Sequence, residues 1–153
     1  MIVFIQYLAI IIIVFLGLLA GTFLSHIAKE ELRPGKKYFV FIRNLLAAIT
    51  GALLFTKFHL IIPLVVGIVL LIVLVNLKTT DAWLYLPASI ILPIAAQNTD
   101  LLIIASSLIF LLGMVMAGLS FNVKESLKKN IKTQLAKNYY FVIIAIVLFF
   151  LLY

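Results

Sequence analysis

The side chains of this sequence that can exchange protons are few, and three of them lie within residues 26–31. His26, Glu30 and Glu31 are residue types that general acid–base catalysis uses. Adjacent residues on a helix point about 100° apart, so the two glutamates do not have to share a site. The sequence has no cysteine, no metal-binding spacing and no phosphate-loop or nucleophile motif. We therefore expect no metal and no cofactor, and catalysis on lipid headgroups is the weakest of three functional hypotheses.

Basic side chains are more frequent and indicate anionic partners. The 12 Lys and Arg residues outnumber the 5 Asp and Glu residues, which gives a formal net charge of +7. Basic residues near a membrane surface bind anionic lipids, so we expect the lipid bilayer and its anionic lipids, and no nucleic acid, as partners. The candidate lipid- or anion-binding residues are Arg33, Lys36, Lys37, Arg43, Lys124, Lys128, Lys129 and Lys132.

Two parts of this basic set have a more specific interpretation: the lysine pair Lys36 and Lys37, and Arg43. The Pro34-Gly35 pair predicts a turn, and the backbone amides of such a turn, next to two lysines, suit an anion. Arg43 is the only charged residue inside a predicted span, about one and a half turns from the span's end. We interpret it as an interface anchor whose long side chain reaches the headgroups. Direct binding of a phosphate by its guanidinium is the alternative.

The elements that must position these side chains are membrane helices. The chain has 153 residues, 66% hydrophobic and 11% charged, whereas soluble domains are usually ~45–50% apolar and ~25% charged. Soluble enzymes, secreted disulfide scaffolds and disordered tails are therefore excluded. The sequence predicts an all-α, polytopic integral membrane helical bundle that forms one multi-pass domain in a cell membrane. Its six predicted transmembrane helices cover residues 2–27, 38–55, 60–77, 82–96, 101–119 and 139–153.

The charges predict how these spans are oriented. With the N-terminus outside, Lys57 is the only one of the 12 Lys and Arg residues that does not face the cytoplasm. Short loops rich in Lys and Arg stay cytoplasmic, so both termini are expected outside. Segment 122–138, with an apolar residue at every fourth position between lysines, predicts a basic amphipathic helix on the inner membrane surface. The last span is short, and it can gain length by taking turns from this segment.

Small residues at helical spacing predict where the helices pack. Gly17 and Gly21 form a GxxxG pattern, which indicates either packing within the chain or a homodimer seam. We expect the first, second and fifth spans to form the centre of the bundle, and the last span to face lipid. The predicted helix-packing residues are Gly17, Gly21, Ala47, Gly51, Gly113 and Ala117.

The fourth span carries two prolines, and Pro93 is expected to kink or break it. Broken membrane helices often line a substrate pathway, so Pro87, Ser89, Pro93 and Ser106 are candidate pathway or hinge residues. The leading hypothesis is an oligomeric carrier or channel for a small neutral or lipid-like solute. A non-catalytic accessory or scaffold subunit of a membrane complex is the first alternative.

Overall fold

The computed structural model of the chain describes residues 4–55, 61–76 and 81–152, and within them all side chains apart from positions 33, 76, 81–84 and 86. The described residues form helices joined by short connections, with no β-strand among them. The predicted all-α bundle is therefore confirmed. The elements are α1 (Phe4–Ile27), α2 (Leu32–Ala52), the 3-10 helix η1 (Leu53–Phe55), α3 (Ile61–Asn76), α4 (Asp81–Ala95), α5 (Thr99–Ser120) and α6 (Leu127–Leu152).

Four helices are long and apolar enough to cross a membrane: α1, α5, α6 and the stretch Pro34–Phe55 of α2 and η1. They have 22 to 26 residues each, which is about 33–39 Å of helix against a bilayer core of roughly 30 Å. The 16 and 15 residues of α3 and α4 give only about 24 and 22 Å. The chain is thus a membrane-type helical protein with two shorter helices in the middle of its sequence.

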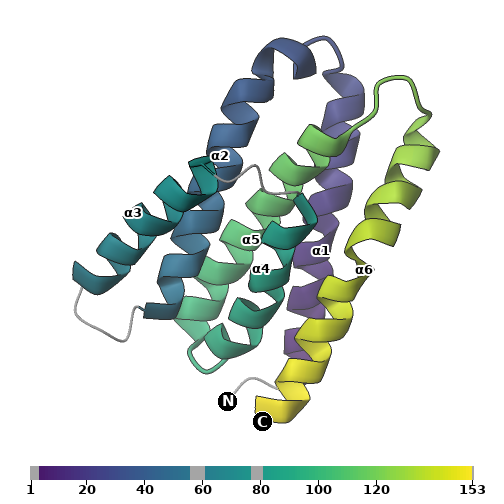
Figure 1. Cartoon of the computed structure of the whole chain (residues 1–153). Coiled ribbons are helices and arrows are strands. Elements are labelled where there is room, and N and C mark those ends of the chain that lie inside the picture. The colour runs from purple at the N-terminus through teal and green to yellow at the C-terminus, as the bar shows by residue number, and fades with distance from the viewer. Residues whose placement is uncertain (1–3, 56–60, 77–80, 153) are drawn as a thin grey trace.

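Successive helices run in opposite directions, and the α1–α2, α4–α5 and α5–α6 connections lie at two ends of the bundle (Figure 1). One end carries the α1–α2 turn at 28–31 and the α5–α6 loop at 121–126. We call it the basic end, because the lysine-rich segments of α2 and α6 start there. The other end carries the start of α1, the end of α6 and the α4–α5 turn. Folding therefore brings two lysine-rich segments, far apart in sequence, to the same end.

The closest helix contact is that between α1 and α5. A Cβ atom at Gly17 would overlap the backbone carbonyl of Phe110, and one at Gly21 would overlap that of Met114. Membrane helices associate through this kind of close backbone approach, because burial from lipid adds no hydrophobic driving force. The GxxxG pattern is therefore used within the chain.

The core is completed by α4 and α6, while α2 contributes only partly buried residues to it. This corrects the expectation of a centre that includes the second span. The last span, expected to face lipid, packs on the bundle with one side and exposes the other, where Ile143 and Val147 are 53% and 50% exposed. Phe141, Ala145 and Phe149 of α6 are all buried. Tyr7 of α1 donates a 3.1 Å hydrogen bond to the carbonyl of Ala145, and its ring stacks on Phe149 with 4.3 Å between centroids. The apolar part of α6, which has no pattern of small residues, thus packs on α1 through aromatic rings.

A single helix, α6, contains both the lysine-rich segment and the last apolar run. The separate surface helix predicted for 122–138 is not observed, since the chain continues from Leu127 to Leu152 without a break. The physical reason is a stripe of amide side chains, Asn130, Gln134 and Asn138, which are buried against the bundle. The first turns of α6 therefore supply the length that the last predicted span lacks.

The second long helix, α2, begins several residues before its predicted start. Pro34 and Gly35 lie in its first turn, and the amide of Gly35 already donates a 2.9 Å hydrogen bond to the carbonyl of Glu31. Proline is tolerated there because its missing N–H would have no partner within the helix. The true turn precedes it, with the Glu31 amide donating to the Ala28 carbonyl at 3.1 Å. The anion-binding turn predicted at Pro34-Gly35 is thus wrong.

Candidate functional site

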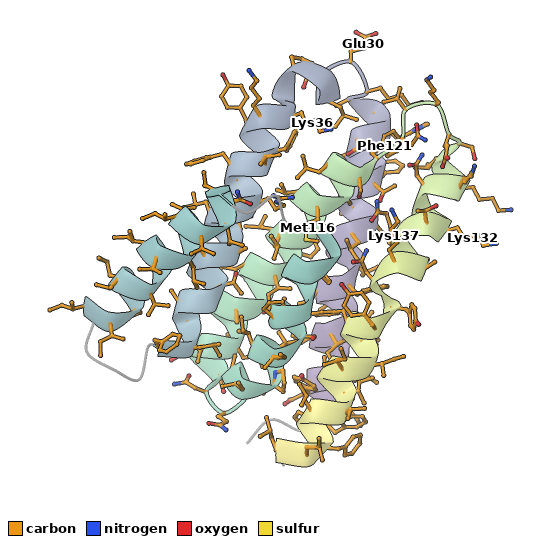
Figure 2. All side chains as sticks on the ribbon, viewed as in Figure 1. Glu30, Lys36, Met116, Phe121, Lys132 and Lys137 are labelled. Carbon is orange, nitrogen blue, oxygen red and sulfur yellow. The ribbon has the colours of Figure 1, made fainter. Side chains whose placement is uncertain are left out.

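The lysines predicted to bind anions are exposed at the basic end on two separate helices. Figure 2 shows Lys36 on α2 and Lys132 on α6 at this end. Lys129 forms an ion pair of 3.1 Å with Glu125, which neutralises part of the charge on α6. The side chain of Arg33 lies outside the described residues. The predicted anion-binding lysines, all exposed, are Lys36 and Lys37 of α2, Lys124 of the α5–α6 loop, and Lys128, Lys129 and Lys132 of α6.

Arg43 lies apart from these lysines, near the middle of the stretch Pro34–Phe55. Its side chain is only 7% exposed, and its Nε and Nη2 atoms donate hydrogen bonds of 3.1 and 3.0 Å to Oδ1 of Asn44. Its role as an interface anchor stays a prediction, although α2 begins earlier than expected and Arg43 therefore lies nearer the middle of the helix. A charge buried in a membrane span is a functional candidate in its own right.

Asn44 links this buried charge to the end of α3. Its Nδ2 atom donates a 3.3 Å hydrogen bond to the carbonyl of Leu74, in the last turn of α3. The last four carbonyls of a helix have no partner within it, and an unsatisfied carbonyl in lipid costs several kcal/mol. The Arg43–Asn44 pair therefore stabilises the C-terminus of α3 from a neighbouring helix, and the guanidinium also suits the negative end of that helix dipole.

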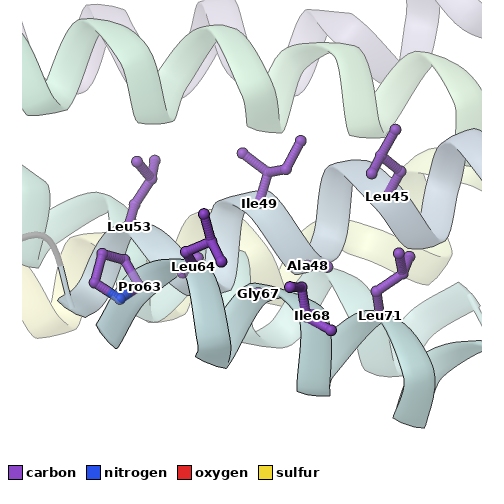
Figure 3. Close-up of a pocket in the computed structure, with 10 residues that line it drawn as sticks. Leu45, Ala48, Ile49, Leu53, Pro63, Leu64, Gly67, Ile68 and Leu71 are labelled. Atoms are coloured by element: carbon purple, nitrogen blue, oxygen red, sulfur yellow. The ribbon is translucent and has the colours of Figure 1, made fainter. Parts of the chain in front are cut away.

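A groove of about 460 Å³ runs between α2 and α3 (Figure 3). Its walls are positions 45–53 and 63–71, and every lining residue is apolar. Ile49 is 41% exposed and Ile68 is 52% exposed, so the groove opens sideways, away from the bundle. The groove exists because α3 packs on α2 and η1 through small residues. A Cβ atom added at Gly67 would lie 3.4 Å from the Cβ of Ala52.

An exposed stripe on α2 continues this groove towards the basic end. Phe41 and Tyr38 precede Leu45 by four and seven residues, which places them on the same helix face. They are 54% and 74% exposed. Lys37 lies one turn beyond Phe41 and is exposed as well. The strip from Lys37 to Leu53 is about 24 Å long at 1.5 Å per residue.

The predicted packing residues lie at helix contacts. A Cβ at Gly51 would be 2.7 Å from a methyl of Leu70, and one at Gly113 would be 2.8 Å from the Tyr85 hydroxyl. Ala117 is fully buried, whereas Ala47 is half-buried beside the core.

The predicted pathway residues have different surroundings in the described part of the chain. The helix α4 continues through both prolines, so the break expected at Pro93 is absent. Ser89 and Pro93 are buried and Pro87 is exposed. Ser106 instead lines a side hollow of about 420 Å³ between α1 and α5, where its hydroxyl donates to the Ile103 carbonyl at 3.0 Å.

Sequence reasoning missed a polar stripe near the basic end. The Nε2 of Gln134 donates to the hydroxyl of Ser120 on α5, and the Nδ2 of Asn138 donates to the Gln134 carbonyl at 2.9 Å. Asn130 holds the α5–α6 loop by accepting from the Asn122 amide at 2.9 Å and donating to the Asn122 carbonyl at 3.0 Å. The spacing of four between Asn130, Gln134 and Asn138 was the available signal.

The acid–base candidates form no compact site. Glu30 and Glu31 are exposed, whereas the Nδ1 atom of His26 is buried without a hydrogen bond and its ring faces Phe121. Across the described ranges, no group of three His, Asp or Glu side chains is placed to hold a metal ion. Comparison of the chain with protein-family models, curated proteins and solved structures finds no match.

Proposed function

We propose that the protein carries a lipid-like solute whose apolar chain enters the α2–α3 groove sideways from the bilayer. The observation that supports this proposal is a wholly apolar groove of about 460 Å³, open at Ile49 and Ile68. Its volume falls in the range of about 300–1,000 Å³ typical of small-molecule sites. Because surrounding lipid is as apolar as the groove, binding depends on close packing against the two helices and selects by shape.

A lipid-like solute suits the molecule better than a polar one. The hydroxyl of Ser106, one of the predicted pathway residues, and that of its neighbour Ser107 both donate to the carbonyl of Ile103 in their own helix, at 3.0 and 2.8 Å. Because α4 is continuous, it also lacks the two facing half-helix ends with which the broken helices of transporters bind polar substrates. In our proposal the protein binds the apolar chain of the solute in the groove and does not bind a hydrated polar group there.

The proposed setting is a cell membrane with the basic end in the cytoplasm. Lysine-rich short connections are retained on that side, and α1 begins and α6 ends at the opposite end of the bundle. This is the N-outside, C-outside orientation expected from the sequence. The groove then opens to lipids within the bilayer, with its strip on α2 leading towards the cytoplasmic headgroups.

Native mass spectrometry of the protein released from nanodiscs tests the proposal. The wild type should retain one lipid per chain, and the double variant Ile49→Trp/Ile68→Trp, which fills the groove, should lose it. The matched control is Ile12→Trp/Ile104→Trp, at positions 53% and 50% exposed on α1 and α5, and it should retain the lipid. Equal retention by all three proteins would overturn the proposal.

An accessory subunit is a second candidate, and the isolation of α3 favours it. Beyond its contacts with α2 and η1, this helix exposes Ile61, Leu64 and Val75 by 70%, 59% and 58%, a surface that a partner helix could cover. A homo-oligomer would also need a surface such as this one, since Gly17 and Gly21 are used within the chain. A stoichiometric foreign subunit in the same mass spectra would favour this candidate over the carrier.

A further inference from the structure

We infer that the solute of the groove is an anionic phospholipid of the leaflet next to the basic end, bound with one acyl chain between α2 and α3 and its phosphate at Lys37 and Tyr38. The inference rests on the proposed function and adds the charge, the leaflet and the position of the headgroup. It is supported by the length of the binding strip, by its charge and by the chemistry of the two residues at its end.

The first support is length. The strip from Lys37 to Leu53 is about 24 Å long, and half of a bilayer, with its headgroup region, is about 20–22 Å thick. A lipid with its phosphate at Lys37 therefore places the end of its chain near Leu53, at the far end of the groove wall. A lipid of the opposite leaflet would have its headgroup near η1 and its chain end among the exposed Phe41 and Tyr38 side chains.

The second support is charge. The first turn of α2 has no acidic residue, and Lys36 and Lys37 follow it, both exposed. Glu30 and Glu31 are the nearest carboxylates in sequence, and they lie in the preceding turn, before α2 begins. The strip therefore ends in positive charge. This charge attracts the phosphate of an anionic headgroup, whereas in a zwitterionic headgroup the positive amine offsets that attraction.

The third support is the chemistry of Tyr38. Its side chain is 74% exposed at the end of the apolar strip, a position where an amphipathic ring favours the headgroup level. Its hydroxyl can donate a hydrogen bond to a phosphate or ester oxygen, while the Lys37 ammonium supplies charge. Together they hold an anionic head above an apolar chain, which is the pattern of a phospholipid.

A lipid titration in detergent, followed by thermal unfolding, tests the inference with phosphatidylglycerol and phosphatidylcholine of identical acyl chains. The wild type should bind phosphatidylglycerol about fivefold more tightly, the factor that about 1 kcal/mol per lysine implies. The variant Lys37→Gln/Tyr38→Phe should lose this preference and still bind both lipids. The matched control, Lys137→Gln/Tyr139→Phe, removes one exposed lysine and one exposed tyrosine hydroxyl from α6 and should keep the preference.

The remaining outcomes separate this inference from the proposed function. If the two lipids bind equally to the wild type, or if the control loses the preference as fully as Lys37→Gln/Tyr38→Phe does, the headgroup assignment is overturned. The groove assignment still holds in that case, provided that Ile49→Trp/Ile68→Trp abolishes binding of both lipids. If this filled variant binds both lipids like the wild type, the proposed function fails and the inference fails with it.

Discussion

Three buried Ser and Thr hydroxyl groups in this bundle are satisfied by carbonyls of their own helices. The hydroxyls of Thr22, Ser25 and Thr50 each donate a 2.7 Å hydrogen bond to the carbonyl four residues earlier. They therefore cost little to bury, but they do not tie one helix to another. Contact between α1 and α5 depends instead on glycines that let the two backbones meet.

The substitution Gly21→Ala tests this dependence at the residue scale. The added methyl overlaps the Met114 carbonyl, and because backbone cannot move aside as a side chain can, we expect a loss of about 1–3 kcal/mol in unfolding free energy. Gly67→Ala is the matched control, since its Cβ lies at an ordinary 3.4 Å from Ala52. Unfolding in mixed micelles measures both, and equal stability of the two variants would contradict this account of the contact.

At the scale of elements, the C-terminal end of α3 receives a hydrogen bond from α2. Asn44 of α2 satisfies the Leu74 carbonyl and is itself bonded to Arg43. Replacing Asn44 with leucine removes this partner, so we expect about 1–3 kcal/mol of destabilisation and faster amide hydrogen exchange in the last turn of α3. Thr50→Val is the control, because the Thr50 hydroxyl bonds only within α2. Unchanged exchange in α3 of Asn44→Leu would remove the assigned role.

The helices themselves were largely predictable from the sequence, because long apolar runs separated by charges have few other folds. The start of α2 and the course of α6 were not. A Pro-Gly pair reads as a turn, yet proline in a first helical turn has the same local chemistry. Lysines alternating with Leu and Ile indicate a helix on the membrane surface. Sequence alone does not show that the amide stripe of Asn130, Gln134 and Asn138 has a bundle to pack against.

The candidate site was predictable only in part. The glycines at the α1–α5 contact carried a pattern, and the structure uses them as packing residues within the chain. The groove had no recognisable sequence pattern, because its lining consists of ordinary apolar residues on two helices. Arg43 was visible as a lone charge, but its burial depends on where α2 begins and on Asn44 beside it. Such features arise from tertiary packing and leave little trace in local sequence.

At the scale of the whole molecule, the charge is polarised between the two ends. The turn at 28–31 and the loop at 121–126 share the basic end, and Asp100 lies exposed near the opposite one. We expect the basic end to face the cytoplasm. Since the chain has no cysteine, single variants Glu30→Cys, Lys132→Cys and Asp100→Cys can be labelled in intact cells. An impermeant maleimide should modify only Asp100→Cys, and modification of Lys132→Cys from outside would contradict the orientation.

The most direct test of the central claim is to map where a photoreactive acyl chain binds. A phosphatidylglycerol with a diazirine in its chain, incorporated in nanodiscs with the protein, should crosslink mainly to positions 45–53 and 63–71, the walls of the groove. Crosslinking there should fall sharply in Ile49→Trp/Ile68→Trp and persist in Ile12→Trp/Ile104→Trp. Labels spread evenly over the exposed faces of α1, α5 and α6 would show that the groove holds no lipid in preference to the rest of the surface, and would contradict the account.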